Sequence, residues 1–346
     1  MRLLLVYPGP LYSTIDLARG FHKAFQKIED VKLFSFQFQK SLTYHDFAQK
    51  FIFAKDFNPE TVTTSASEDI LIRILKCRPD WVLFISGLAF PATTWEYVKQ
   101  LQNDLKHPFK TAVFLTESPY VESWEKGILE RVDMAFTTDY GIIDEYKQVN
   151  PNLHYIKHAY DPEIHYGTGH PRENEVFFIA TGFPERQRLL EEVDWSGIDL
   201  QLYGNWMYMT DKSPLFPYLK GENLQNVEAA EKYRNAKIAL NIFRTVQWPD
   251  DNPKFIEPSK AKSLSPRIYE AMACGSLLFT DWREELDTLP KDSYVLWGDA
   301  RDLEEKVRYY LSHDAEREGR ALAGQKAVEG HTFDARAREI LARLKE

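Results

Sequence analysis

The sequence predicts an α/β protein made of two tandem, doubly wound (Rossmann-like) parallel-sheet domains that face each other across a cleft. Short, continuous apolar runs of strand length recur along the chain, and segments with helical periodicity separate them. Continuous apolar runs indicate strands that helices cover on both faces, as in parallel sheets. The pattern restarts after residues 158–174, a stretch with Pro, Gly and charge but no periodicity, and 346 residues suffice for two domains.

The first predicted domain, residues 1–165, alternates apolar strands with amphipathic helices. Strands are expected at residues 2–8, 31–36, 80–86, 111–117 and 132–138, with helices at 15–28, 67–77 and 93–105. The aromatic-rich stretch 34–57 is interpreted as a core-facing helix side, and a flexible binding platform is the alternative.

The second predicted domain, residues 166–330, repeats this alternation. Strands are expected at residues 176–182, 199–204, 237–243, 276–280 and 293–297, with helices at 186–193, 226–234, 266–274 and 303–311. Doubly wound sheets bind ligands at the carboxyl ends of their strands. The residues that follow each strand are therefore the candidates for chemistry.

The composition narrows the functional class. The formal net charge is −9, from 43 Lys and Arg against 52 Asp and Glu, which argues against a duplex-DNA binder and makes any anion site local. Cys77 and Cys274 cannot form a disulfide framework or a zinc site by themselves, and the histidines show no metal-ligand spacing. Neither a leader pattern nor an apolar run of membrane-spanning length occurs, so we expect a cytoplasmic protein without stable membrane insertion.

The segment SLSPRIYEAMACGSLLFTD, residues 263–281, is the most informative one. Ser265 and Pro266 predict a helix start, where Ser caps free N–H groups and Pro suits the first turn. Arg267 in that turn makes the helix end suitable for an anion such as a diphosphate. Glu270, one turn further, is placed to accept hydrogen bonds from a ribose or sugar hydroxyl. An ordinary strand–helix unit with a surface Arg and Glu is the alternative.

Further cations lie near this helix in the sequence. The segment ATGFPERQRLL, residues 180–190, places Gly182 at the end of a strand and both Arg186 and Arg188 at a helix start, where guanidinium groups can clamp phosphate oxygens. Projection of Arg186 into solvent is the alternative. The long loop within residues 240–262 carries four more cations, some of which are expected to be plain surface groups: Arg244, Lys254, Lys260 and Lys262.

In the first half, TESPY places Glu117 at the carboxyl end of the fourth strand, as a general base, a sugar-hydroxyl ligand or, alternatively, a helix cap. His158 lies where the halves join and has either a catalytic or a structural role. The GxGxxG fingerprint and the phosphate loop are both absent. Asp-x-Asp, a metal–diphosphate ligand pair, does not occur either, so no metal ligands are assigned.

The chain resembles glycosyltransferases of the GT-B fold, and within them the CgeB-like (spore-maturation protein) group related to family 4. The resemblance rests on five segments in the family's order over residues ~176–341: FIATGFPERQRLL, LQLYGNW, ALNIF, SPRIYEAMACGSLLFTD and HTFDARAREIL. The segments TESPY, VDMAFTTD and HAYDP match the amino-terminal half more loosely.

This resemblance implies metal-independent transfer of a sugar from a nucleotide-sugar donor, most often a UDP-sugar, with no required cofactor. It implies that Glu270 holds the donor ribose, and that Arg186 with the Ser265–Arg267 helix start stabilises the departing diphosphate. Gly182 would allow close backbone approach. The remaining residues expected near the nucleotide are Tyr203, Gly204, Asn205, Trp206 and Asn241. A last helix, residues 331–346, would cross back to the first domain.

One departure concerns stereochemistry. Related retaining enzymes pair two glutamates eight positions apart, but the earlier position here is Lys262, for which Glu257 is a possible substitute. Retention is preferred, and inversion with Glu117 as the base stays open. The acceptor is expected to be a protein, a polysaccharide or a small molecule, with modified DNA as an alternative. A non-catalytic sugar-nucleotide-binding protein and a nucleotide-sugar epimerase are further alternatives.

Overall fold

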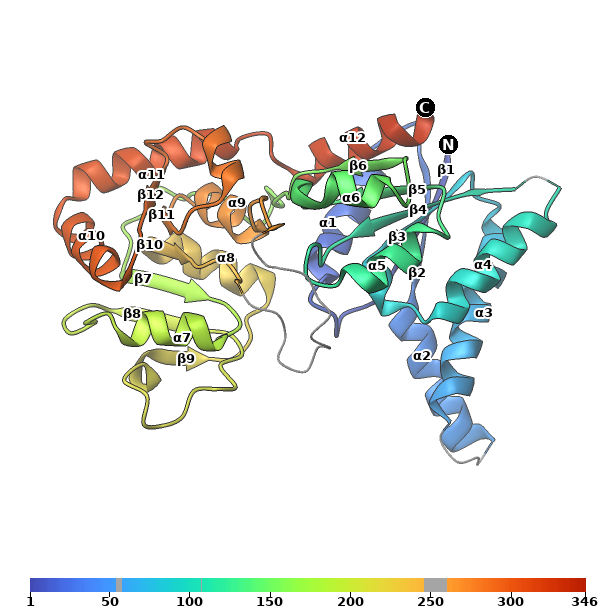
Figure 1. Ribbon diagram of the computed structural model, residues 1–346, viewed down its shortest axis with the longest axis horizontal. Helices are drawn as coiled ribbons and strands as arrows, with labels where there is room; N and C mark the ends of the chain where they lie inside the picture. Colours follow the sequence, from blue (N-terminus) through green and yellow to red (C-terminus); the bar gives the residue numbers. More distant parts are fainter. Residues whose placement is uncertain (54–57, 107, 246–259) are drawn as a thin grey trace. The chain divides into compact units, whose positions relative to one another are not determined.

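The computed structural model describes residues 1–53, 58–106, 108–245 and 260–346 (Figure 1). The described chain divides into two compact units. Among the described residues, unit 1 contains those of 1–156 and the carboxy-terminal residues 333–346, and unit 2 contains residues 157–245 and 260–332. Each unit is a parallel β-sheet with helices packed on both faces, so the predicted α/β fold of two doubly wound domains is confirmed.

Unit 1 contains a parallel sheet with the strand order β2-β1-β3-β4-β5-β6. Its strands are β1 (Arg2–Tyr7), β2 (Lys32–Gln37), β3 (Trp81–Ile85), β4 (Lys110–Leu115), β5 (Met134–Thr137) and β6 (Leu153–Tyr155). The central strands are apolar at consecutive positions because both of their faces are covered. On β1, Leu4 and Val6 pack with α3 (Pro59–Cys77) and α4 (Ala92–Asp104). Leu3 and Leu5 pack on the opposite face with α1 (Ile15–Gln26) and α12 (Phe333–Lys345).

The helices of unit 1 follow the chain around this sheet. They are α1 (Ile15–Gln26), α2 (Phe38–Phe47), η1 (Ala48–Ile52), α3 (Pro59–Cys77), η2 (Gly87–Ala89), α4 (Ala92–Asp104), α5 (Glu122–Leu129), η3 (Tyr140–Ile142), α6 (Ile143–Lys147) and α12 (Phe333–Lys345). The start of α3 is fixed by Asn58, whose side chain accepts the backbone N–H groups of Glu60 and Thr61 at 3.0 and 3.3 Å.

Helix α12 packs against α1 within unit 1. The ring of Phe333 lies where a side chain on Gly20 would be, since a Cβ there would come within 2.3 Å of it. The same ring lies 5.3 Å from Phe21, and Lys27 pairs with Asp334 at 3.2 Å. Chain-terminal residues thus complete the core of the amino-terminal unit.

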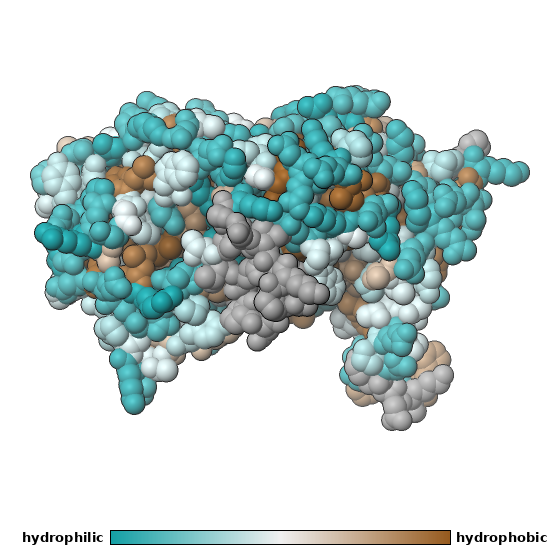
Figure 2. Space-filling model, viewed as in Figure 1, coloured by the Kyte–Doolittle hydropathy of each residue, from teal (hydrophilic) through white to brown (hydrophobic). Residues whose placement is uncertain are grey.

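The aromatic stretch 34–57 does not form one core-facing helix side. Phe38 is buried, but Tyr44, Phe47, Phe51 and Phe53 are exposed at the outer end of α2 and η1. Apolar atoms are visible at this projecting end of unit 1 (Figure 2). The core interpretation is therefore wrong for the later part of the stretch, and residues 54–57 lie outside the described residues.

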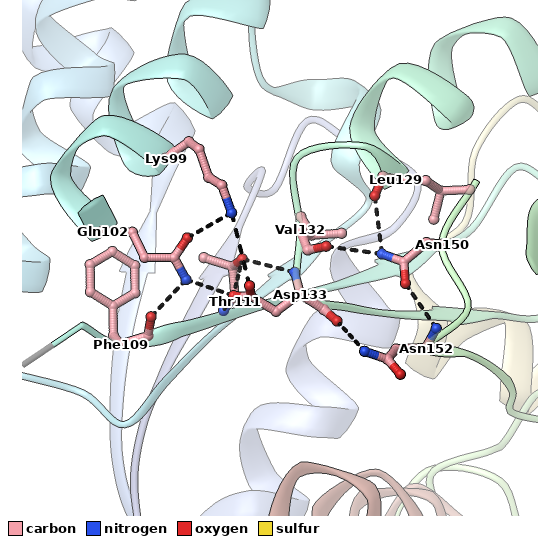
Figure 3. A network of polar contacts seen from close by, with 9 residues as sticks. All are labelled: Lys99, Gln102, Phe109, Thr111, Leu129, Val132, Asp133, Asn150 and Asn152. Carbon is pink, nitrogen blue, oxygen red and sulfur yellow. Dashed lines mark hydrogen bonds and ion pairs between the residues drawn. The ribbon is translucent and has the colours of Figure 1, made fainter.

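A polar network fixes the amino ends of β4 and β5 (Figure 3). Asp133 Oδ2 accepts hydrogen bonds from the backbone N–H of Thr111 at 2.7 Å and from Gln102 Nε2 at 2.6 Å. Asn150 Nδ2 donates to the carbonyls of Leu129 and Val132. All of these hydrogen bonds join groups of the protein to one another. The amino ends of β4 and β5 are therefore held in place by this network.

Unit 2 contains a second parallel sheet with the order β12-β11-β10-β7-β8-β9. Its strands are β7 (Asn174–Ile179), β8 (Leu200–Tyr203), β9 (Leu219–Gly221), β10 (Ala236–Asn241), β11 (Leu277–Thr280) and β12 (Tyr294–Leu296). Starting at β7, the chain adds strands toward β9 and then returns to the other side of β7 at β10. The strand order therefore reverses between β7 and β10, the position at which doubly wound sheets bind ligands.

The helices of unit 2 are α7 (Pro184–Glu191), η4 (Phe216–Tyr218), α8 (Asn226–Asn235), α9 (Pro266–Ala273), η6 (Glu284–Thr288), α10 (Ala300–Ser312) and α11 (Asp314–Val328). Every strand and helix expected from the periodicity is present. The short strands β6 and β9 and the helices α5, α6 and α11 were not expected. Among the described residues no helix is both long and apolar enough to cross a membrane.

Candidate functional site

The candidate site is the carboxyl edge of the unit 2 sheet, where the strand order reverses. Three chain segments leave the sheet at this edge. They are residues 180–183 after β7, residues 242–245 after β10 and residues 281–283 after β11. The amino end of α9 follows in the same region, because Ser265 is hydrogen-bonded to the last residue of β10.

Arg186 joins the two strands at the reversal. Its side chain is 4% exposed, so projection into solvent is wrong. Nη1 donates to the carbonyl of Thr181 at 3.0 Å, and Nη2 donates to the carbonyl of Ile242 at 2.6 Å. These carbonyls follow β7 and β10, so the guanidinium bridges the two exits and fixes a positive charge between them.

Two phenylalanines carry further guanidinium groups at this edge. Arg186 and Arg244 lie 5.3 and 5.0 Å from the ring centre of Phe183, and Arg283 lies 4.1 Å from that of Phe243. Arg283 also donates to the carbonyls of Ser263 and Arg244. Cation–π contacts and carbonyl acceptors hold these groups in place without cancelling their charge.

Asp281 is the carboxylate that accompanies these cations. Its two oxygens accept the backbone N–H of Phe243 at 3.0 and 3.2 Å. Burial raises the pKa of Asp281 to about 6, while the Phe243 hydrogen bond and the nearby Arg283 and Arg186 act in the opposite direction. Asp281 thus lies within electrostatic reach of both Arg283 and Arg186.

The start of α9 is positioned by Asn241, the last residue of β10. Asn241 is 2% exposed; its Nδ2 donates to Thr280 Oγ1 at 2.9 Å, and its Oδ1 accepts from Ser265 Oγ at 3.1 Å. Ser265 occupies the N-cap position, but its side chain makes no cap hydrogen bond to the first turn. The expected capping role of Ser265 is therefore wrong, since its hydroxyl is used to dock α9 onto β10.

Arg267 and Glu270 lie half-exposed on α9. Both act electrostatically on the phenol of Tyr233. Burial raises the pKa of that phenol; Glu270 raises it further, and Arg267 lowers it. Arg267 and Glu270 thus place opposite charges on one face of α9, beside the carboxyl edge. Pro266, the first residue of this helix, is exposed.

The glycines after β7 and β8 are required by packing inside unit 2. A Cβ on Gly182 would lie 2.3 Å from the ring of Trp206. Gly204 has φ +114, and a Cβ there would lie 2.0 Å from the carbonyl oxygen of Ala180. Gly182 donates its N–H to the carbonyl of Asn205 at 2.8 Å. These contacts explain both glycines without a ligand.

Tyr203 and Asn205 differ in exposure. Tyr203 is buried, with Lys232 Nζ 5.4 Å from the centre of its ring, whereas Asn205 is exposed. Glu285, which the sequence did not indicate, is 2% exposed and accepts the N–H of Leu264 at 2.6 Å. Lys157 pairs with Glu285 at 3.1 Å, which anchors the approach to α9.

Other predicted residues lie apart from this edge or outside the description. Lys262, at the position expected for a glutamate, pairs with Glu284 at 3.0 Å. Lys254 and Glu257 lie outside the described residues. His158 is half-buried in unit 2, in the stretch between β6 and β7.

Glu117 lies in unit 1, half-buried after β4, next to a buried carboxyl group. Glu125 on α5 is 1% exposed, and its Oε2 accepts the hydroxyls of Ser118 and Tyr146, each at 2.7 Å. Burial, with a smaller contribution from the Glu117 charge, raises the pKa of Glu125 to about 7, although the hydrogen bonds from Tyr146 and Ser118 act in the opposite direction. The carboxyl edge of the unit 1 sheet thus gathers carboxyl groups.

Comparison with known proteins shows what the sequence is similar to. Residues 186–342 match the family model described as Glycosyl transferase-like. The chain is 24% identical over 286 residues to Spore protein CgeB of Bacillus subtilis (strain 168), over 80% of this chain and 84% of that protein.

Solved structures share the fold over the whole chain. An alpha-glucosyltransferase in complex with UDP-glucose and DNA containing an abasic site has a TM-score of 0.70 at 13% identity and covers 100% of both chains. Sucrose-phosphate synthase from Thermosynechococcus elongatus has a TM-score of 0.64 at 14% identity, covering 99% of this chain and 98% of its own. Anabaena HepE in complex with UDP-glucose has a TM-score of 0.62 at 11% identity and covers 99% of both.

The chain therefore has the GT-B fold of these solved structures, and its residues 186–342 match a glycosyltransferase-like family model. It is also similar to CgeB, so the resemblance expected from the sequence is confirmed, while the relation to family 4 stays a prediction. Across the described ranges, no group of three or more His, Cys, Asp and Glu side chains could hold a metal ion.

Proposed function

We propose that the protein transfers a hexose from a nucleotide-sugar donor, specifically a UDP-sugar, to an acceptor, and that the donor binds at the carboxyl edge of the unit 2 sheet. The observation that carries this proposal is the buried Arg186 guanidinium between the exits of β7 and β10, with α9 docked beside it through Asn241. A fixed cation at a strand-order reversal is suited to the diphosphate of such a donor.

In this proposal the cations of the edge do the work of charge neutralisation. Arg267 contacts the diphosphate, and Arg186 supports it through its charge because both of its Nη atoms already donate to carbonyls. Their positive charge favours the transition state, in which negative charge develops on the departing UDP. Glu270 accepts hydrogen bonds from the ribose. Asn241 acts as a positioning residue for the start of α9.

The relatives support a UDP-sugar as the donor. Two of the fold neighbours are described in complex with UDP-glucose. Independence of a metal ion is part of the proposal, based on the absence of Asp-x-Asp from the sequence and on the guanidinium groups at the edge. We further propose a cytoplasmic location, supported by the two free, buried cysteines.

The stereochemical outcome is proposed to be retention, with inversion as the alternative. Inversion requires a base from the acceptor side, for which Glu117 is the candidate, and His158 is a second candidate for proton transfer. Determining the anomeric configuration of the product by NMR distinguishes the two outcomes. An unchanged rate in Glu117→Gln would remove that residue as the base.

Release of UDP tests the proposal. The protein is incubated with UDP-glucose or UDP-N-acetylglucosamine, with and without a chelator, and UDP is measured over time. We expect UDP release to continue in the presence of the chelator. The rate of release should fall at least about tenfold in Arg267→Ala and Glu270→Ala and stay unchanged in Arg188→Ala. Arg188 is a matched control because it is an exposed arginine on α7. Equal rates in all variants would contradict the site.

Modified DNA is a second candidate acceptor. The alpha-glucosyltransferase with the same fold is described in complex with DNA, whereas the −9 charge of this chain does not favour a polyanion. A DNA acceptor predicts affinity that falls steeply with salt. Binding that does not depend on salt leaves a protein, polysaccharide or small-molecule acceptor. If the protein binds the donor but shows no turnover with any acceptor, it would instead be a non-catalytic sugar-nucleotide-binding protein.

A further inference from the structure

A pocket of about 490 Å³ lies at the opposite, amino edge of the unit 2 sheet. It is bounded by residues 167–172 before β7, by Lys237 at the start of β10, by Gly275 before β11 and by one face of α11. Its volume falls within the range of small-molecule pockets in proteins. None of its lining residues belongs to the candidate donor site.

The walls of the pocket are fixed by hydrogen bonds. Arg172 Nη1 donates to the carbonyls of Tyr233, Arg234 and Ala236, and Nη2 donates to that of Cys274. Gly275 has φ +79, and a Cβ on it would come within 2.7 Å of Arg172 Nη2. The guanidinium of Arg172 is therefore held in one orientation before any ligand arrives.

Cationic groups converge on this pocket. Arg172, Lys237 and Arg317 line it, against the single lining carboxylate of Glu318. Arg317 is 5% exposed. Burial lowers the pKa of the Arg172 guanidinium, and the nearby charge of Arg317 lowers it as well. Two guanidinium groups thus lie within electrostatic reach of each other, an arrangement that a bound anion would stabilise.

The acidic side chains that pair with these cations would compete only weakly with an anionic ligand. Lys237 Nζ is 3.9 Å from Glu175, and both side chains are about one-quarter exposed. Arg317 pairs with Asp314, whose side chain is 71% exposed, and its Nη2 is 4.0 Å from Glu318. Partly exposed ion pairs contribute little free energy, so a ligand anion can replace these partners at small cost.

The remaining lining indicates more than a bare ion. Ala321 and the half-exposed Leu322 give one wall an apolar surface, and Pro171 lies in the segment opposite. The volume also exceeds what inorganic phosphate needs. A ligand that carries both an anionic head and a non-ionic body matches this combination of walls.

We infer that this pocket is a second ligand site, which binds a small phosphorylated metabolite of sugar-phosphate size through Lys237 and Arg317. The site is independent of the proposed donor site because it occupies the opposite edge of the sheet. Charge-assisted hydrogen bonds to phosphate are worth about 1.5–3 kcal/mol each, so removal of one cation is expected to weaken binding about tenfold or more.

Calorimetric titration with glucose 6-phosphate and, separately, inorganic phosphate tests the inference on the full chain. Lys237→Gln removes one cation, and Leu322→Glu places a carboxylate at the rim of the pocket. Lys326→Gln is the matched control, since Lys326 is exposed on the same helix and does not line the pocket. Thermal melting of each variant shows that it is folded.

The expected result is saturable binding of glucose 6-phosphate that is tighter than that of phosphate. It should weaken about tenfold in Lys237→Gln and Leu322→Glu and stay unchanged in Lys326→Gln and Arg267→Ala. No binding at 10 mM ligand (about the highest practical concentration for a weak site), or wild-type affinity in both pocket variants, would overturn the inference. Displacement by UDP together with loss in Arg267→Ala would also overturn it, by assigning the binding to the carboxyl edge.

Discussion

The carboxyl edges of the two sheets have the same architecture and opposite chemistry. In unit 2, Arg186 and Arg283 donate to backbone carbonyls beyond the strands. In unit 1, Glu117 and the buried Glu125 occupy the corresponding edge. The two parallel sheets have equivalent positions at their carboxyl edges. The side chains that follow the strands decide whether such a position suits an anion or a hydroxyl group.

The comparison explains how an acidic chain can hold an anionic ligand. The net charge of −9 is a property of the whole chain, whereas the field at a site depends on groups within roughly one Debye length of about 10 Å. The guanidinium groups of Arg186 and Arg283 in unit 2 donate to backbone carbonyls and lie against aromatic rings, which carry no formal charge. The carboxyl group of Glu125 is held by neutral hydroxyls and favours its protonated form near neutrality.

The largest expected effect concerns Glu125 and the pH dependence of stability. Its pKa is raised from the ordinary 4.5 to about 7 in the folded protein, so the native state holds this proton over a range in which the unfolded chain has released it. The contribution is full below pH 4.5 and is lost as the pH rises to about 7, by about 3 kcal/mol in total.

Denaturant unfolding of the wild type and Glu125→Gln between about pH 3.5 and 8 measures this effect, a window of roughly one unit on either side of the two pKa values. Glutamine stays neutral and keeps an oxygen for the Ser118 and Tyr146 hydroxyls, so its curve should lack the decline. Parallel pH profiles for the two proteins would show that the pKa of Glu125 does not change on folding, and this would contradict the proposed contrast between the two edges.

The next effect concerns Gly182 in unit 2. Gly182→Ala places a methyl group against Trp206 and should destabilise the protein by about 1–3 kcal/mol, since the indole is enclosed. Gly319→Ala on α11 is the matched control, because a Cβ there meets nothing within 4 Å. That change should stabilise by about 0.5–1 kcal/mol. Thermal melting of both variants compares them, and a neutral Gly182→Ala would mean that Trp206 can move away.

A smaller effect is expected for Asp281, which opposes the cations of the unit 2 edge. Asp281→Asn keeps an acceptor for the Phe243 N–H and removes a negative charge beside Arg186 and Arg283. Affinity for UDP should rise about two- to fivefold, as for a single partly screened charge. Weaker binding of UDP in this variant would instead assign Asp281 a direct role in holding the ligand.

The sequence predicted the strands because their signal is local. Central strands such as β1 and β10 are continuous apolar runs with both faces buried. Strands β6 and β9 were missed because their short sequences, LHY and LKG, contain no continuous apolar run. Strand β12 is equally short and was predicted from its apolar sequence YVL. Helix α5 was missed because its buried face includes Glu122 and Glu125, which reduce the apolar pattern.

The sequence analysis predicted which residues form the candidate site, but not which contacts those residues make. The acceptors of Arg186 include the carbonyl of Ile242, 56 residues away, and the sequence gives no sign of that contact. Ser265 marked the start of α9 correctly, but its partner is Asn241, which lies 24 residues earlier. Glu285 and Asp281 received no role, because burial of a carboxylate depends on long-range packing.

The most direct measurement of the central claim is calorimetric titration of UDP into the wild type, Arg267→Ala and Arg188→Ala. A donor site at the carboxyl edge of the unit 2 sheet predicts that Arg267→Ala weakens UDP binding about tenfold or more, while Arg188→Ala binds as the wild type does. Equal affinity of all three proteins for UDP, or loss in Arg188→Ala alone, would contradict the claim.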